Sequence, residues 1–170
     1  MGKTAPLSLI RLAPEPECEL DLALRLATDL AAFLNFDEKL PKGIRHPPGV
    51  PLETGQSVLS FAKEWCSDRN ARFYAIVIGD ETAIGSISLS HIDTAAQAAR
   101  SGYWLGSAYH GRGYGTEALS KLLAIARDCG LKHIAATIST DNEPSNRIWE
   151  KVGAQIRHGG GHISAIIELS

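Results

Sequence analysis

The sequence predicts an α+β fold, with one domain built on a mixed, mostly antiparallel sheet of six to seven strands flanked by about four helices. The early strand segments follow one another through short turns, as in an antiparallel meander, whereas a later strand, helix and strand follow in the order of a β-α-β unit. The length of 170 residues and the 44% hydrophobic content suit one globular domain. This mixed order disfavours a regular doubly wound parallel sheet.

The first half of the chain contains two helical patterns and a hairpin pattern. Leucines that fall mostly on one helical face predict the first helix, and two apolar runs around a Gly-Asp-Glu connection predict antiparallel strands. Repeated proline and glycine make the segment between the two helices irregular. The expected order is a strand over 7–12, a helix over 17–34, an irregular segment over 35–51, a helix over 53–67, and strands over 73–78 and 83–91.

The second half begins with a polar linker over 93–101 and an aromatic strand over 102–106. An apolar stripe predicts a helix over 113–129, and Gly130 provides its C-terminal stop. A triple glycine near the C-terminus marks the turn between two closing strands. The remaining elements are expected as a strand over 131–140, a helix over 141–151, and strands over 154–157 and 162–169.

Charge and cysteine usage exclude several classes of function. The net charge of −2 gives no sign of the broad basic face that nucleic-acid binding requires. No run approaches the ~20 apolar residues of a membrane span. The three cysteines are widely spaced and form no C-x-x-C pair, so the sequence suggests neither a disulfide framework nor a metal site. We therefore expect a cytoplasmic protein without nucleic-acid or membrane partners.

A glycine-rich hexapeptide, residues 110–115, separates the aromatic strand from the strongest helix. Alternate glycines let backbone N–H groups approach an anion, and the helix directs its positive end to the same point. A dinucleotide fingerprint would need glycine at Thr116, and a Walker loop would need Lys and Ser or Thr at Arg112 and Gly113. The loop therefore predicts a phosphorylated ligand of another kind.

The order of motifs around this loop resembles the GNAT superfamily of acyl-CoA-dependent N-acyltransferases. The matching segments, in family order, are Tyr103-Trp104-Leu105-Gly106, His110-x-x-Gly113-x-Gly115, Asn142-x-x-Ser145 and Glu150-Lys151-x-Gly153. They are most similar to the ribosomal-protein alanine N-acetyltransferase subgroup. The resemblance implies a single domain over 1–170, with acceptor-side elements at about 15–70 and an acetyl-CoA-binding core at about 101–154.

The resemblance implies transfer of acetyl from acetyl-CoA, as co-substrate, to a primary amine by direct attack in a ternary complex. A protein N-terminal amine is the favoured acceptor on subgroup resemblance. The alternatives are a small-molecule amine, such as a polyamine or an antibiotic, and a non-catalytic CoA-binding module. Since dimers are common in the subgroup, a homodimer is compatible with the resemblance.

The resemblance also implies which residues bind the donor. The backbone of the loop would hold the pyrophosphate, the main chain of the aromatic strand would bond the pantetheine arm, and an asparagine would contact that arm. His110 stands where the family has Arg or Gln, and Arg112 is a candidate to compensate. The implied donor-binding residues are Trp104, Leu105, His110, Gly111, Arg112, Gly113, Tyr114, Gly115, Thr116 and Asn142.

Two residues are candidates for catalysis. Ser145 is the candidate acid, because many family members place a tyrosine four residues later and that position here is Trp149, whose indole has no suitable proton. His91, with Asp93 nearby, is the candidate base. An α-amine with a pKa of about 7.7 to 8.0 needs little help at neutral pH, so loss of its proton through water is the alternative.

Overall fold

The computed structural model describes residues 6–40, 44, 54–79, 81–139 and 143–169. Within these residues seven strands form one sheet in the order β1-β2-β3-β4-β5-β7-β6, with four α-helices and a 3-10 helix around it. In this part of the chain, no helix has the length and apolar character needed to cross a bilayer. The strands are β1 Leu7–Ala13, β2 Arg72–Ile78, β3 Thr82–Asp93, β4 Ala98–Leu105, β5 His133–Ser139, β6 Gln155–Gly159 and β7 His162–Glu168. The helices are α1 Leu20–Phe36, α3 Gly55–Arg69, η1 Ser107–Tyr109, α4 Tyr114–Asp128 and α5 Glu143–Lys151.

The sheet is antiparallel except at its centre. Strands β1 to β4 form an antiparallel meander, β4 and β5 are parallel, and β5, β7 and β6 are antiparallel again. The connection between the parallel pair runs through α4, which makes the predicted β-α-β unit. The predicted α+β fold is confirmed.

The largest difference from the predicted bounds is at the aromatic strand, which begins at Ala98, within the segment predicted as a polar linker. The stretch Ala98–Ser101 has weak strand propensity, but β3 pairs with it on one side and β5 on the other. Hydrogen bonding on both sides overrides local propensity, since strand preference depends strongly on context. The turn is therefore confined to residues 94–97.

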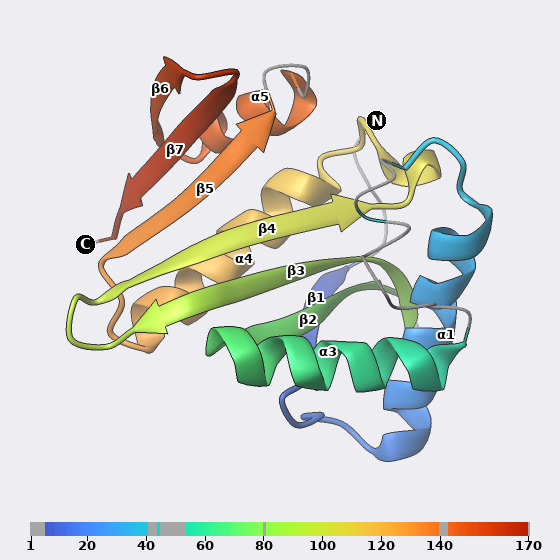
Figure 1. The fold of residues 1–170 in the computed structure, drawn as a ribbon. Helices are drawn as coiled ribbons and strands as arrows, with labels where there is room; N and C mark the ends of the chain where they lie inside the picture. The colour runs from blue at the N-terminus through green and yellow to red at the C-terminus, as the bar shows by residue number, and fades with distance from the viewer. Residues whose placement is uncertain (1–5, 41–43, 45–53, 80, 140–142, 170) are drawn as a thin grey trace.

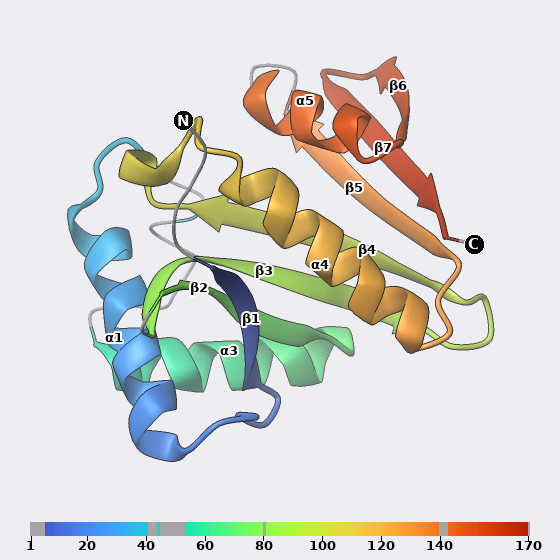
Figure 2. The same ribbon diagram turned by 180° about the vertical axis from the view of Figure 1, so that it is seen from behind.

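Helices cover both faces of the meander (Figure 1). Figure 2 shows α4 crossing one face of β3 and β4, where its buried stripe packs in the larger core cluster around Leu119 and Leu122. Helices α1 and α3 pack together on the other face, and the core there includes Leu26 and Leu30. Strand β4 thus lies between two apolar layers.

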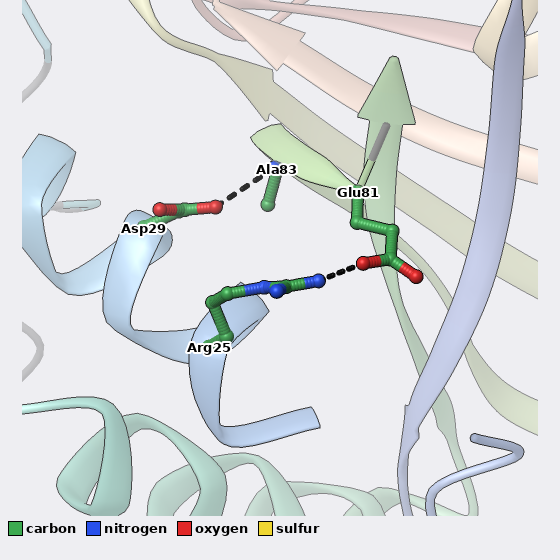
Figure 3. A network of polar contacts seen from close by, with 4 residues as sticks. All are labelled: Arg25, Asp29, Glu81 and Ala83. Carbon is green, nitrogen blue, oxygen red and sulfur yellow. Dashed lines mark hydrogen bonds and ion pairs between the residues drawn. The ribbon is translucent and has the colours of Figure 1, made fainter. Parts of the chain in front are cut away.

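Helix α1 is attached to the β2–β3 hairpin by polar contacts (Figure 3). The carboxylate of Asp29 accepts a hydrogen bond from the backbone N–H of Ala83 over 3.1 Å. One turn earlier, Arg25 forms an exposed ion pair with Glu81. Because exposed ion pairs contribute little, the Asp29 contact and the apolar packing account for most of the attachment.

Candidate functional site

The β4–β5 pairing stops partway along both strands. The ladder has three residue pairs, from Ala98 opposite His133 to Arg100 opposite Ala135, although both strands continue beyond it. Figure 1 shows the two strands diverging toward the C-terminal end of β4, with α5 near the far end of β5. We call the β4 main chain from Ser101 to Leu105, on the side that faces β5, the open edge.

The register with β3 determines which main-chain groups lie on the open edge. Gly106 donates its N–H to Ile84 over 2.8 Å, so alternate residues from Gly106 backward bond toward β3. The carbonyl of Trp104 accordingly points toward β3. Its oxygen lies so close to Gly85 of β3 that a Cβ added to this glycine would stand 2.1 Å from it. The N–H and C=O groups of Tyr103 and Leu105 therefore face the open edge, while those of Trp104, the predicted pantetheine contact, face β3.

The segment Gly106–Gly113, which we call the glycine loop, connects the open edge to α4. Gly111 and Gly113 have φ values of +74° and +85°, in the left-handed region that favours glycine. Gly113 is the N-cap of α4 and offers no side-chain hydrogen bond to the helix. The first N–H groups of α4 are therefore available to an anion at this end of the helix.

Side chains from α1 hold the start of the glycine loop. Asp37, the C-cap of α1, accepts two hydrogen bonds from Ser107, one from the backbone N–H over 2.7 Å and one from Oγ over 2.8 Å. Although burial opposes ionisation, these donors hold the pKa of Asp37 below its ordinary value. A Cβ on Gly106 would stand 2.4 Å from the Phe33 ring, so only glycine permits this approach.

The two basic residues of the loop are both held by aromatic or backbone groups. Nε2 of His110 donates to the carbonyl of Leu105 over 2.9 Å, so the imidazole covers the last carbonyl of the open edge. The guanidinium of Arg112 lies 5.9 Å from the centre of the Tyr109 ring. Arg112 is exposed on the loop and is the basic side chain nearer to α4 in sequence.

The start of α4 packs tightly against its neighbours. Tyr114 is buried, with its ring 6.2 Å from that of Tyr109. A Cβ on Gly115 would stand 2.8 Å from Cδ1 of Ile148 in α5. Glycine at 115 thus has a packing reason, in addition to its predicted place in the anion loop. Thr116 is half-buried in the first turn.

Ser145 lies near the start of α5 and is buried, with 8% of its surface exposed. Its hydroxyl makes a hydrogen bond with the hydroxyl of Tyr103. Trp149, one turn later, is 1% exposed in the large core cluster, in agreement with a packing role. Asn142, the predicted contact of the pantetheine arm, lies outside the described residues.

His91 lies away from this pair of hydroxyls. It has a φ of +52° in a bulge of β3, and its Nδ1 contacts Ser90 Oγ over 3.1 Å. Ser90 is opposite Arg100 in the register, so His91 lies beside the paired start of β4. Three residues of strand, about 10 Å, separate Arg100 from Tyr103. The structure does not bring His91 and Ser145 together, and Asp93 accepts a bond from the Ala96 N–H within its own turn.

A hollow of about 450 Å³ opens beside the C-terminal half of α1. Phe33, Phe36 and Ala108 are among the residues that line it, and the residues of the open edge are not. Both of its carboxylates, Asp29 and Asp37, accept hydrogen bonds from protein donors. The hollow borders only the start of the glycine loop, at Ser107 and Ala108. We therefore place the candidate site at the open edge and the end of the loop next to α4, and not in this hollow.

Comparisons with known proteins show the family of this chain. Residues 21–155 match the family described as the acetyltransferase (GNAT) domain. The chain belongs to the GNAT family. In sequence it is 32% identical, over 75 residues, to the "Putative ribosomal N-acetyltransferase YdaF" of Bacillus subtilis. That match covers 44% of this chain and 41% of the relative, so it spans less than half of each.

Solved structures of acetyltransferases share the GNAT fold of this chain. RimL, a ribosomal L7/L12 α-N-protein acetyltransferase in complex with coenzyme A, is 16% identical, with a TM-score of 0.69 over 98% of this chain and 94% of its own. The microcin C7 self-immunity acetyltransferase MccE, in complex with acetyl-CoA and AMP, is 23% identical, with a TM-score of 0.65 over 86% and 88%. The predicted family and fold are confirmed, and an N-acetyltransferase with acetyl-CoA as co-substrate agrees with them.

The structure connects two further residues to the site that the sequence patterns do not single out. Tyr103 stands in the sequence only as part of an aromatic strand, although the period-2 alternation of β4 places it on the α4 side with Leu105. Asp37 falls in a segment predicted to be irregular, 70 residues before its partner Ser107. The alternation of side chains along the strand is a signal from which Tyr103 could be found. No sequence pattern signals Asp37, because it contacts a residue far away in the chain.

Proposed function

We propose that this GNAT protein transfers the acetyl group of acetyl-CoA to a primary amine, and that the amine is a protein N-terminus. The observation that carries the proposal is the open edge of β4, which leads directly to the glycine loop and the N-terminus of α4. An extended ligand arm can add main-chain hydrogen bonds to such an edge, and an anionic end suits the helix terminus.

The residues present fit the donor. The N–H and C=O groups of Tyr103 and the N–H of Leu105 would bond the pantetheine arm along the open edge, and backbone N–H groups from Gly111 to Thr116 would hold the pyrophosphate. Arg112 would add a positive charge beside it. The donor core is thus proposed at about 101–154, and the acceptor-side elements at about 15–70.

The reaction requires two proton transfers. Acetyl-CoA supplies an activated acetyl group. The neutral amine forms the new C–N bond, the C–S bond breaks with its electron pair on sulfur, the nitrogen loses a proton and the sulfur gains one. A backbone N–H on the open edge would stabilise the developing oxyanion. Ser145, at the start of α5, is the proposed donor of a hydrogen bond to sulfur, and water is the simplest route for the amine proton.

The preference for a protein N-terminal amine comes from the named relatives. The Bacillus subtilis relative is named as a ribosomal N-acetyltransferase, and the RimL structure is that of a ribosomal-protein α-N-acetyltransferase. An α-amine also has a pKa of about 7.7 to 8.0, well below that of a lysine, so more of it is neutral at pH 7. A small-molecule amine and CoA binding without turnover are the other outcomes of the test.

The experiment measures CoA thiol release from acetyl-CoA with a panel of N-terminal peptides, polyamines and aminoglycosides. We expect turnover with peptides, located by mass spectrometry on the α-amine. Gly113→Ala should weaken acetyl-CoA binding at least tenfold in calorimetry. Gly130→Ala is a matched control, because both glycines are left-handed, at +85° and +83°, with open space around them, at opposite ends of α4.

Three results would contradict the proposal. Turnover with polyamines or antibiotics alone would replace the acceptor class. Tight CoA binding with no acetyl transfer to any amine would favour the non-catalytic module. Equal acetyl-CoA affinity in the Gly113→Ala and Gly130→Ala variants would remove the pyrophosphate from the start of α4.

A further inference from the structure

A guanidinium connects β4 and β5 at the point where the two strands separate. Arg100 is the last β4 residue of the parallel ladder, opposite Ala135, and its Nη2 donates a hydrogen bond to Oγ1 of Thr137 over 2.5 Å. Because paired positions advance together along a parallel ladder, Thr137 lies at about the level of Gly102. The charge of Arg100 is thus carried forward from the ladder to the start of the open edge.

Arg100 lies on the face of the sheet opposite α4. Trp104 packs in the core of α1 and α3, with its ring centre 6.2 Å from that of Phe33 in α1. Side chains alternate between the two faces of a strand, so Arg100 and Gly102 share the face of Trp104. Leu105 belongs to the core cluster of α4 on the other face.

This face is open around Arg100. A Cβ on Gly102 would have nothing within 4 Å, and the side chains of Arg100 and Thr137 are both exposed. Figure 1 views this face, with α1 and α3 beside the first three strands and no helix of the described residues in front of β5 or β7. Since α4 covers the other face of β4 (Figure 2), an acceptor reaches the open edge from the side of Arg100.

The charge of Arg100 is left for a ligand. Within the described part of the chain the guanidinium forms no ion pair, and the hydroxyl that it bonds, that of Thr137, is neutral. Two acids lie in this region: Asp93 is bonded within its own turn, and Glu168 lies opposite His133. His133 is four residues, or about 13 Å, before Thr137 on β5. An arginine stays charged, and its preferred partner is a carboxylate that accepts two parallel hydrogen bonds.

We propose that Arg100 selects acceptors that carry a carboxylate near the reacting amine, so that the substrate is a protein N-terminus with Asp or Glu among its first three residues. The inference rests on the proposed function and narrows its acceptor. Because the amine reacts at the open edge, only the residues next to it come within reach of Arg100, and three extended residues already span about 10 Å. The same charge repels a polyamine, which carries further cationic nitrogens.

The test compares kcat/KM for peptides that differ at one residue. One N-terminal peptide is made with Glu, Gln or Lys at each of its first three positions in turn, at saturating acetyl-CoA. For at least one position we expect the wild-type protein to prefer Glu to Gln by about tenfold, because a charge-assisted hydrogen bond is weakened but not lost by partial exposure. At that position Lys should be a poorer substrate than Gln.

Two variants of Arg100 separate its charge from its packing. Arg100→Gln keeps an N–H donor for Thr137 and removes the charge, so the ratio of the Glu to the Gln peptide should fall to about one. Arg100→Glu should reverse the order and make the Lys peptide the best of the three. Each ratio compares peptides on a single variant, so partial loss of folding or of acetyl-CoA binding cancels.

Arg157→Gln is the matched control, because it removes the same charge from the same face. Arg157 is exposed and lies opposite Ser164, which in turn lies opposite Thr137. It is therefore two strands, or about 10 Å, from Thr137, near the distance over which salt screens exposed charges. The ratio of the Glu to the Gln peptide should stay within about twofold of the wild-type ratio.

The outcomes distinguish this inference from the proposed function. Acetylation of all the peptides at equal kcat/KM would overturn the selection by Arg100 and leave the proposed function in place. Equal effects of Arg100→Gln and Arg157→Gln on the ratio would overturn it as well, since only the general charge of the face would then matter. A wild-type protein that acetylates no peptide would overturn the proposed function and this inference together.

Discussion

The contact between Asp37 and Ser107 makes a quantitative prediction, because it joins the end of α1 to the start of the glycine loop. Asp37→Asn keeps one acceptor oxygen and presents an amide N–H₂ to a second donor of Ser107. A hydrogen bond to a charged group contributes about 1.5 to 3 kcal/mol, and partial exposure reduces this. We expect a loss of about 1.5 kcal/mol in the free energy of unfolding, or about 4 °C in Tm for a chain of this length.

The same substitution should change the pH dependence of stability. The pKa of Asp37 is lower in the folded state than in the unfolded state. The ionised carboxylate therefore contributes its full stabilisation of the fold above the unfolded-state pKa of about 4, and this stabilisation is lost as pH falls through the folded-state pKa. The difference in stability between wild type and Asp37→Asn, measured by urea unfolding, should therefore be full at pH 7 and shrink progressively as pH falls below ~4.

Binding separates this contact from an ordinary stabilising one. Asp37→Asn should also weaken acetyl-CoA binding several-fold, because the loop start loses its support from α1. Asp29→Asn is the control: Asp29 also accepts from a backbone N–H, but that of Ala83 at the hairpin. It should cost stability and leave acetyl-CoA affinity unchanged. If Asp37→Asn binds acetyl-CoA like wild type, or its stability loss stays constant as pH falls below ~4, the reasoning is refuted.

Three further predictions concern packing and reactivity. Gly85→Ala should lower the free energy of unfolding by about 3 kcal/mol or more, because the new Cβ would stand 2.1 Å from a carbonyl oxygen of β4 and overpack against rigid backbone. Gly102→Ala is the control: a Cβ there would have nothing within 4 Å, so urea unfolding should show almost no change in stability. Burial raises the pKa of Cys66 to about 11, so native protein at pH 8 should react with a thiol reagent at the exposed Cys129 first, and equal rates would contradict the buried thiol. Trp149→Phe should lower Tm and leave the pH profile of kcat unchanged, because a buried indole donates no proton to the reaction; a shifted profile would count against this.

The fold is largely predictable from the sequence, and the donor side of the site stays a prediction. Period-2 and period-3.6 patterns locate the helices and strands, and the glycine spacing around Gly113 by itself indicates a phosphorylated ligand. The start of β4 is not predictable in this way, because the polar stretch from Ala98 becomes a strand only through pairing with β3 and β5. Local propensity contains no information on such partners.

The polar contacts of the site are less predictable. His110 occupies a family position expected to face phosphate, and its ring instead donates to the carbonyl of Leu105. The contacts of Ser145 with Tyr103, and of Asp37 with Ser107, join segments 42 and 70 residues apart. No short-range pattern encodes which distant hydroxyl or carboxylate a side chain meets, because the meeting is decided by how helices pack on the sheet.

The open edge of β4 has a consequence for stability. Edges of sheets usually lie at the periphery, where another chain can add a strand, but this one is enclosed within the sheet, since β5 rejoins β4 at Arg100. A long foreign strand cannot enter a wedge that is closed at one end, whereas a slender arm can. In the proposed site the backbone donors of this edge are left for acetyl-CoA, and a ligand concentration of about 100 times Kd would raise the free energy of unfolding by about 2.7 kcal/mol.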